Sequence, residues 1–185
     1  MKKHEPKLGR VLPQDFYMRP TIEVARDLLG KVIEHGGRAG RIVEVEAYLG
    51  EGDAAAHSAR GATPRTRVIF GRPGHAYVYF IYGMHYCLNL VAEPEGKAGC
   101  VLIRALEPLF GVTQACNGPA KLTRSLGITL AQNGCDVSRG PIRLYTEKKD
   151  GEALQIATSP RIGITKSVDL PLRFFLAGNP FVSRP

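Results

Sequence analysis

The segment 41–48, Arg-Ile-Val-Glu-Val-Glu-Ala-Tyr, alternates apolar and polar side chains from Val43 onward. In an extended strand this alternation places the valines and the alanine on one face and Glu44, Glu46 and Tyr48 on the other. The first face is typical of a strand packed on a core. The second presents two carboxylates and a phenol at spacings of about 6–7 Å. A half-buried strand with a polar solvent face has the same pattern, and local spacing does not say which glutamate would act in catalysis.

The segment 50–74 has no sustained periodicity, and we predict an ordered loop that can hold one helical turn. A loop of this length in a compact domain is usually functional or flexible. It carries His57, which on local grounds is a surface residue, and four arginines: Arg60, Arg65, Arg67 and Arg72. Each arginine alone is explained equally well by solvation of the loop. Four of them within thirteen residues favour a surface that faces phosphates.

Two aromatic-rich strands are predicted at 77–81 and 86–91, joined by the turn Tyr82-Gly83-Met84-His85. Aromatic residues beside a turn glycine often pack back onto the sheet. At a hairpin tip, however, Tyr82 and Met84 leave large apolar surfaces exposed, which usually marks a contact site. In a DNA-binding protein such side chains can act as a wedge that unstacks base pairs.

A short helix is predicted at 21–29, with Thr21 as its cap and Gly30 just past its end. A strand at 31–34 then turns back through Gly36-Gly37 into the 41–48 strand as an antiparallel pair.

An apolar strand at 100–106 is interrupted by Arg104. An arginine inside such a run is costly unless it is paired, and Glu46 is the natural candidate partner. A second helix opens at Gly118-Pro119 and ends at Gly127. With Lys121 close by, its N-terminus suits a phosphate, although a plain surface helix start fits equally well.

Further short strands are predicted at 142–145, 154–157, 162–164 and 172–176, ending with one at Phe181-Val182. Together these elements predict one α+β domain, residues 1–185, with a curved, mostly antiparallel β-sheet and a few surrounding helices. Residues 1–15 are expected to form a loosely held basic lead-in.

The composition is consistent with a single domain, since 44% of the residues are hydrophobic. The net charge of +8 fits a nucleic-acid partner or another anionic surface. The four cysteines show no zinc-site spacing, so free thiols in a cytosolic protein are expected and no metal is predicted. The chain has no run of eighteen apolar residues and no apolar segment after its basic start, so neither a membrane span nor secretion is expected.

These motifs together resemble the alkyladenine (3-methyladenine) DNA glycosylases of the mammalian type. The resemblance runs in order from about residue 20 to the C-terminus. It is carried by segments 41–50, 55–58, 63–65, 77–84, 87–89, 102–108, 118–122 and 171–174. Two departures stand out: segment 109–117 is much shorter than in mammalian members, and Phe181 stands where those members have Trp.

The resemblance implies an enzyme that hydrolyses the N-glycosidic bond of alkylated or deaminated purines in duplex DNA. Among these are 3-methyladenine and hypoxanthine, and the product is an abasic site. On the family pattern Glu46 is the general base that activates water, and Arg104 helps to hold that water. The damaged base is flipped out of the duplex into a pocket. The remaining roles fall to substrate-binding residues Tyr48, His57, Tyr79 and Asn89, and to DNA-binding residues Tyr82, Met84, Arg60, Arg65 and Lys121.

Locally, each of these residues has a plainer interpretation: Tyr48 and Tyr79 as core tyrosines, Asn89 as a strand-end hydrogen-bonding residue. No lysine or proline nucleophile is indicated, so a monofunctional glycosylase without a cofactor is expected, acting as a monomer. Its expected place is the bacterial cytoplasm or, in a eukaryote, the nucleus. Two alternatives stay open: a non-catalytic nucleic-acid-binding domain, and an enzyme that acts on RNA or free nucleosides.

Overall fold

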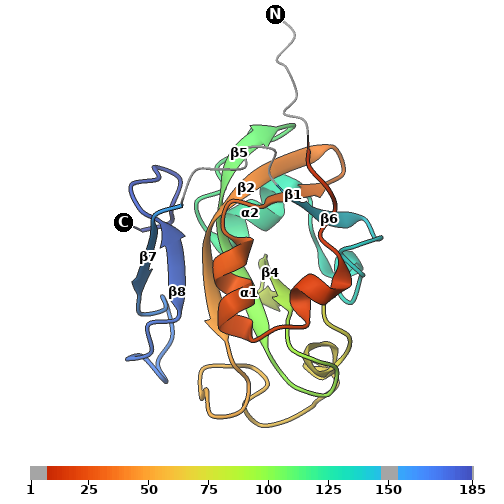
Figure 1. Ribbon diagram of the computed structural model, residues 1–185, viewed down its shortest axis with the longest axis vertical. Helices are drawn as coiled ribbons and strands as arrows, with labels where there is room; N and C mark the ends of the chain where they lie inside the picture. The colour runs from red at the N-terminus through yellow and green to blue at the C-terminus, as the bar shows by residue number, and fades with distance from the viewer. Residues whose placement is uncertain (1–7, 147–153, 185) are drawn as a thin grey trace, which may run out of the picture.

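Eight β-strands form one curved, antiparallel sheet, and two α-helices pack against it (Figure 1). The computed structural model describes residues 8–146 and 154–184. The strands are β1 (Val32–His35), β2 (Arg38–Tyr48), β3 (Ala76–Ile81), β4 (His85–Val91), β5 (Cys100–Phe110), β6 (Ile142–Tyr145), β7 (Ile156–Ser159) and β8 (Arg173–Leu176). The helices are α1 (Thr21–Leu28) and α2 (Pro119–Leu126), with 3-10 turns η1 (Gln14–Tyr17), η2 (Arg67–Phe70) and η3 (Leu130–Gln132). The predicted α+β class with a curved antiparallel sheet is confirmed.

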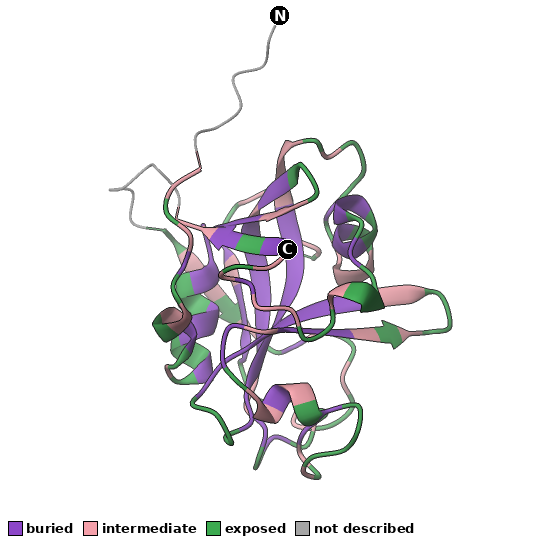
Figure 2. Cartoon of the chain, turned by 90° about the vertical axis from the view of Figure 1, so that its right-hand side faces the viewer, coloured by how far each residue is buried: buried purple, intermediate pink, exposed green. Residues whose placement is uncertain are grey.

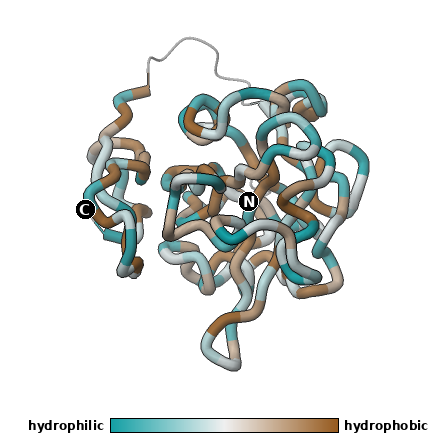
Figure 3. Tube along the Cα trace, turned by 90° about the horizontal axis from the view of Figure 1, so that it is seen from below, coloured by the Kyte–Doolittle hydropathy of each residue, from teal (hydrophilic) through white to brown (hydrophobic). Residues whose placement is uncertain are grey.

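The long strand β2 is the centre of the sheet. The sheet order is β3-β4-β5-β2-β1-β6, and β2 pairs with β1 through its first half and with β8 through residues 44–46. Strand β8 in turn pairs with β7, so the last two strands and the C-terminus lie on one side of the molecule (Figures 1 and 3). This double use of β2 brings the end of the chain next to the two glutamates of the 41–48 segment.

The pairing of β2 with β5 is irregular at the position of Arg104. Glu44 pairs with Ala105 and the next residue, Val45, pairs with Ile103, so the register skips Arg104 on β5. Such a bulge re-aims a side chain relative to the regular alternation. Here it allows the Arg104 guanidinium to reach both Glu44 and Glu46 on the neighbouring strand.

The core lies between the sheet and the two helices. The apolar face of β2 is completely buried, as the alternation predicted, and α1 packs on β2 and β5 through Val24, Ala25 and Leu28. Figure 2 shows the strands mostly as buried and the turns as exposed. The polar face of β2 is buried too, because Glu44 and Glu46 have no exposed surface. The sequence left open a solvent-facing carboxylate row, and the structure excludes it.

The ends of α1 and α2 and the start of α2 lie where the glycines and the proline of the sequence predict them. Gly30 follows α1 with a φ of 80°, and Gly127 ends α2 in the left-handed region with a φ of 71°. Pro119 is the first residue of α2, as expected where the free N–H is not needed.

Three local predictions differ from the structure. Residues 162–164 are not a strand, because the Ile162 amide bonds to a glutamate carboxylate rather than to a neighbouring strand and Gly163 has a φ of 76°. Phe181-Val182 lies in turns rather than in a strand. Of the expected loose lead-in, residues 1–7 lie outside the described residues, whereas Val11 bridges to Tyr145 and Leu12 is buried.

Thr21 does not cap α1 with its side chain, because a distant carboxylate occupies that position. The Glu93 Oε1 atom accepts hydrogen bonds from the Thr21 amide at 2.7 Å and from its hydroxyl at 2.9 Å. Lys97 Nζ lies 2.9 Å from Glu93 Oε2. Burial alone would raise the pKa of Glu93, but these hydrogen bonds outweigh it and hold the pKa below its usual value.

We therefore expect Glu93→Ala to lower the free energy of unfolding by about 1–2 kcal/mol, because it leaves a buried helix-start amide without an acceptor. Glu93→Gln keeps an oxygen acceptor and should lose less than half as much. Urea denaturation at neutral pH measures both. Equal losses in the two variants would show that the cap is not the source of the stability.

No helix in residues 8–146 and 154–184 is long and apolar enough to cross a membrane.

Candidate active site

A cavity of about 490 Å³ opens beside the C-terminal end of β2. The parts of the chain that enclose it are the end of β2 and the loop after it, the β3–β4 hairpin, strand β5, the segment 162–166 and the first residues of α2. Rings of Tyr48, His57, Tyr77 and Tyr79 line it, together with Asn89 and Arg104. The cavity therefore offers an aromatic slot with a few polar groups, the usual composition of a site for a flat ligand.

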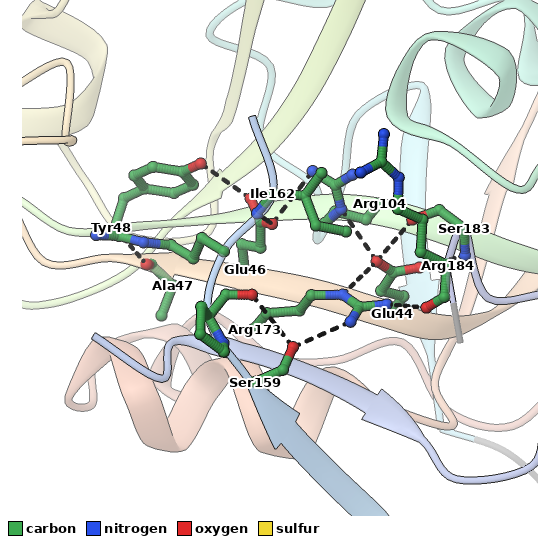
Figure 4. A network of polar contacts seen from close by, with 12 residues as sticks. Glu44, Glu46, Ala47, Tyr48, Arg104, Ser159, Ile162, Arg173, Ser183 and Arg184 are labelled. Carbon is green, nitrogen blue, oxygen red and sulfur yellow. Dashed lines mark hydrogen bonds and ion pairs between the residues drawn. The ribbon is translucent and has the colours of Figure 1, made fainter. Parts of the chain in front are cut away.

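Glu46 lies directly behind the wall of this cavity. Its Oε1 atom accepts a hydrogen bond from the Ile162 amide at 2.7 Å and lies 3.2 Å from Arg104 Nη1. Its Oε2 atom accepts one from the Tyr48 hydroxyl at 2.9 Å (Figure 4). All three donor residues line the cavity, whereas Glu46 itself has no exposed surface.

Glu44, two residues earlier on the same face, belongs to a different environment. Arg104 Nε at 3.0 Å and Arg173 Nε at 2.8 Å both meet its Oε1 atom. The Ser183 hydroxyl donates to Oε1 at 2.8 Å and the Ser183 amide donates to Oε2 (Figure 4). Arg173 also donates to the carbonyl oxygen of Arg184. Glu44 thus ties β2, β5, β8 and the C-terminal segment together.

The two glutamates have opposite pKa shifts. Burial raises the pKa of Glu46, and the Arg104 charge and the Ile162 and Tyr48 hydrogen bonds offset this only in part. Burial also acts on Glu44, but the bonds from Ser183 and Arg173 outweigh it and lower its pKa. A carboxylate that has a raised pKa and touches the cavity wall is suited to take up a proton, whereas one held as an anion by two arginines is suited to a structural role.

Comparison with known proteins shows the family to which the chain belongs. A family model described as methylpurine-DNA glycosylase matches residues 15–180. The chain belongs to the methylpurine-DNA glycosylase family. This membership supports a DNA glycosylase of base excision repair, with DNA as its partner.

Similar proteins of this family occur in several organisms. A protein of Bradyrhizobium diazoefficiens named "Putative 3-methyladenine DNA glycosylase" is 47% identical, over 100% of this chain and 96% of the relative. Proteins of the same name from Methanoculleus marisnigri and Koribacter versatilis are each 48% identical. They cover 94% and 93% of this chain, and 98% and 92% of the relatives. These relatives are not mammalian, so a mammalian type within the family stays a prediction.

The aromatic residues expected to hold a base in this glycosylase all line the cavity. The His57 and Tyr79 ring centroids lie 4.6 Å apart with an interplanar angle of 75°, and His57 Nδ1 lies 3.1 Å from the Tyr77 hydroxyl. Burial, with a smaller contribution from the Arg65 charge, lowers the pKa of His57, which keeps its ring neutral near pH 7. A neutral ring does not repel a positively charged ligand, whereas an imidazolium would.

Asn89 lies at the buried end of the cavity with only 3% of its surface exposed. Its Nδ2 donates to the Tyr77 carbonyl oxygen at 3.2 Å, and the Cys100 thiol donates to its Oδ1 at 3.8 Å. These contacts fix the orientation of the amide.

Of the residues predicted to contact DNA, only Tyr82 borders the cavity. Tyr82 is 82% exposed at the turn between β3 and β4 and also borders the cavity. Met84, on the same turn, is 69% exposed. The exposed residues Arg60, Arg67, Arg72 and Lys121 do not line it, although Lys121 follows Pro119 and Ala120, which do. Arg65 lies with Cζ 5.3 Å from the Tyr79 ring centroid, so it supports the aromatic wall as well as adding charge.

Several site residues were not predicted from the sequence. Tyr77 shares a strand face with Tyr79 at a spacing of two residues, and that periodicity was a usable signal. Arg161, Asp53, Arg173 and Ile162 come from irregular or distant segments, and no local pattern connects them to the 41–48 strand.

Proposed function

We propose that this protein removes alkylated and deaminated purines, 3-methyladenine and hypoxanthine among them, from duplex DNA by hydrolysing the N-glycosidic bond. The observation that carries the proposal is Glu46, a buried carboxylate with a raised pKa. Its hydrogen-bond donors Tyr48, Arg104 and Ile162 all belong to the wall of an aromatic cavity.

The cavity suits a base that has been rotated out of the duplex. A planar purine fits between Tyr48 and the His57–Tyr79 wall, where stacking and, for a cationic base, cation–π attraction hold it. Asn89 then meets the edge of the base, and its fixed amide disfavours the exocyclic amino group of guanine.

Glu46 supplies the proton acceptor for the attacking water. Its Oε1 receives two donors and its Oε2 receives one from the described residues, which leaves a lone pair on Oε2, on the Tyr48 side, for a water molecule. Because Glu46 is completely buried, water reaches it when the Tyr48 phenol shifts from its present contact.

The water loses a proton to the carboxylate, its oxygen bonds to the sugar C1′, and the bond from C1′ to the purine nitrogen breaks. The electron pair of that bond leaves with the base. No covalent enzyme intermediate is required, in keeping with a monofunctional hydrolase.

The direct test incubates the protein with duplex oligonucleotides that carry one 3-methyladenine or one hypoxanthine, followed by hot alkali to cleave abasic sites. We expect alkali-dependent strand breaks at the lesion and none without alkali. Tight binding to lesion duplexes without any abasic product would instead establish a non-catalytic binding domain.

Tyr82 provides a second test, because its exposure separates DNA contact from stability. Tyr82→Ser should leave the melting temperature within about 1–2 °C of wild type, since an exposed tip side chain contributes about 0.5 kcal/mol or less. Loss of one stacking contact, about 1–3 kcal/mol, should weaken binding to a lesion duplex roughly 5- to 150-fold in a titration. Met84→Ser is the matched control at the same turn, with a smaller expected effect. A sharp fall in the melting temperature of Tyr82→Ser would mean that the tyrosine stabilises the fold.

Asn89 provides the specificity test. Asn89→Ser shortens the side chain at the buried end of the cavity and should raise excision of 7-methylguanine relative to hypoxanthine by roughly tenfold, a typical effect of one small group in a pocket. Competition between the two lesions in one reaction measures the ratio. An unchanged ratio in a folded variant would place the selectivity elsewhere in the cavity.

A further inference from the structure

Tyr48 is backed by a buried arginine on the side away from the cavity. Arg161 has a side chain with no exposed surface and does not line the cavity, whereas Tyr48 does. The Arg161 Cζ atom lies 4.6 Å from the centroid of the Tyr48 ring. The ring therefore stands between this guanidinium and the space where a base would stack.

Asp53 neutralises Arg161 through a two-pronged ion pair. Arg161 Nη1 donates to Asp53 Oδ2 at 2.6 Å, and Nη2 donates to Oδ1 at 2.7 Å. Nη1 also donates to the Ala47 carbonyl oxygen at 2.9 Å, which holds the guanidinium against β2. Burial would raise the pKa of Asp53, but the Arg161 bonds and the Leu49 amide hold it below its usual value, so the carboxylate stays ionised near pH 7.

The charge balance of this pair matters for a ligand on the far face of Tyr48. An unpaired cation behind an aromatic ring opposes a second cation in front of it, both through direct repulsion and by drawing on the same ring quadrupole. A neutral base in front of the ring meets no such repulsion.

We propose that the Arg161–Asp53 pair is a specificity-determining element. Asp53 cancels the charge of Arg161 behind Tyr48, which allows the cavity to accept positively charged alkylated purines as well as neutral ones. The inference rests on the proposed excision of purines from the cavity. Arg161 and Asp53 act through Tyr48 and do not touch the base.

The expected size of the effect on a cationic base follows from its distance to the Arg161 guanidinium. A base stacked on Tyr48 places its centre roughly 8–9 Å from the guanidinium, since stacked rings have centroids about 4.5 Å apart. With an effective dielectric constant of about 20, one uncancelled charge at that distance disfavours a cationic base by up to roughly 30-fold.

The experiment compares 3-methyladenine, which is cationic in DNA, with hypoxanthine, which is neutral. Neither base carries the guanine 2-amino group, so the expected Asn89 selectivity does not distinguish them. Asp53→Asn removes the cancelling charge, and Arg161 cannot respond by losing its proton. We expect the ratio of kcat/KM for 3-methyladenine over hypoxanthine to fall about 3- to 30-fold in this variant.

The double variant Asp53→Asn with Arg161→Gln removes both charges and should return the ratio to within about twofold of wild type. If the pair were only structural, removing both partners would lower the excision of both lesions. The ratio of kcat/KM for 3-methyladenine over hypoxanthine would then not return from its Asp53→Asn value to that of wild type. Asp27→Asn is the matched surface control: it breaks the Arg19–Asp27 pair, 2.8 Å apart and away from the cavity, with the same change in net charge. Its ratio should stay that of wild type.

The outcomes separate the inference from the proposed function. Wild-type protein that excises neither lesion defeats the proposed function. Wild-type protein that excises both, with an unchanged ratio in folded Asp53→Asn or an unrestored ratio in the double variant, overturns only the role of the pair. If Asp53→Asn does not fold, the double variant, which buries no unpaired charge, must still keep the wild-type ratio, and a shift beyond about threefold overturns the inference.

Discussion

Glu46→Gln should reduce excision of hypoxanthine by roughly 10²–10⁴-fold, the usual contribution of a general base. The amide keeps the size of the side chain and accepts the Ile162 and Arg104 hydrogen bonds through one oxygen, but it cannot take a proton from water. 3-Methyladenine, already cationic and a better leaving group, should lose less. Single-turnover kinetics with enzyme in excess separate this chemical step from binding, which should survive or tighten.

The pH dependence provides a second signature of the same residue. Glu46 must be ionised to act as a base, and burial raises its pKa, so activity should fall on acidification at a pH above that expected for an ordinary glutamate. This acid limb should be absent from the residual activity of Glu46→Gln. If Glu46→Gln is as active as the wild type, the carboxylate-base mechanism is wrong for this chain.

Stability should respond in the opposite sense at the two glutamates. A group whose pKa is raised on folding contributes stability that is lost as pH rises through the raised value, so Glu46→Gln should not lower the melting temperature at pH 7. Glu44 has a lowered pKa in the folded state, so its contribution is present at pH 7 and is lost as pH falls through that lowered value.

Glu44→Gln is therefore expected to destabilise the protein by about 3–5 kcal/mol at pH 7, because it leaves the buried Arg104 and Arg173 without their shared carboxylate. Denaturant unfolding at pH 7 measures the loss, and the gap between Glu44→Gln and wild type should narrow toward acid pH. Ser183→Ala is the milder control, since it removes one hydroxyl donor and keeps the amide. A Glu44→Gln variant as stable as wild type, with Glu46→Gln unstable, would mean that the roles of the two carboxylates are exchanged.

Much of the fold could be predicted because local patterns and tertiary packing agree. The alternation in segment 41–48, the turn at Gly36-Gly37 and the Pro119 and Gly127 ends of α2 all correspond to observed elements. The strand predicted at 162–164 was wrong because the apolar residues of this segment line a cavity and its backbone bonds to a carboxylate. No local sequence pattern reports either contact.

Part of the candidate site could also be predicted from the sequence, and part could not. Residues on strands, such as Glu46, Tyr48 and Tyr79, could be proposed from their order along the chain, and the structure gathers them around one cavity. The choice between Glu44 and Glu46 could not come from alternation, because both lie on the same face. It depends on Arg173 and Ser183, which are more than 120 residues away and meet Glu44 only in the folded protein.

The bonds of Glu44 have a consequence for the order in which the molecule is assembled. Residues 44, 104, 173 and 183 meet at one carboxylate, so the cluster closes loops that span most of the chain. Contacts between residues this distant carry a large loop-closure entropy and form late in folding. A chain emerging from the ribosome can build β1, β2 and α1 early, but Glu44 receives its bonds from Arg173 and Ser183 only after those residues have been made. Partly synthesised chains would therefore contain much of the sheet while Glu44 still lacks two of its partners.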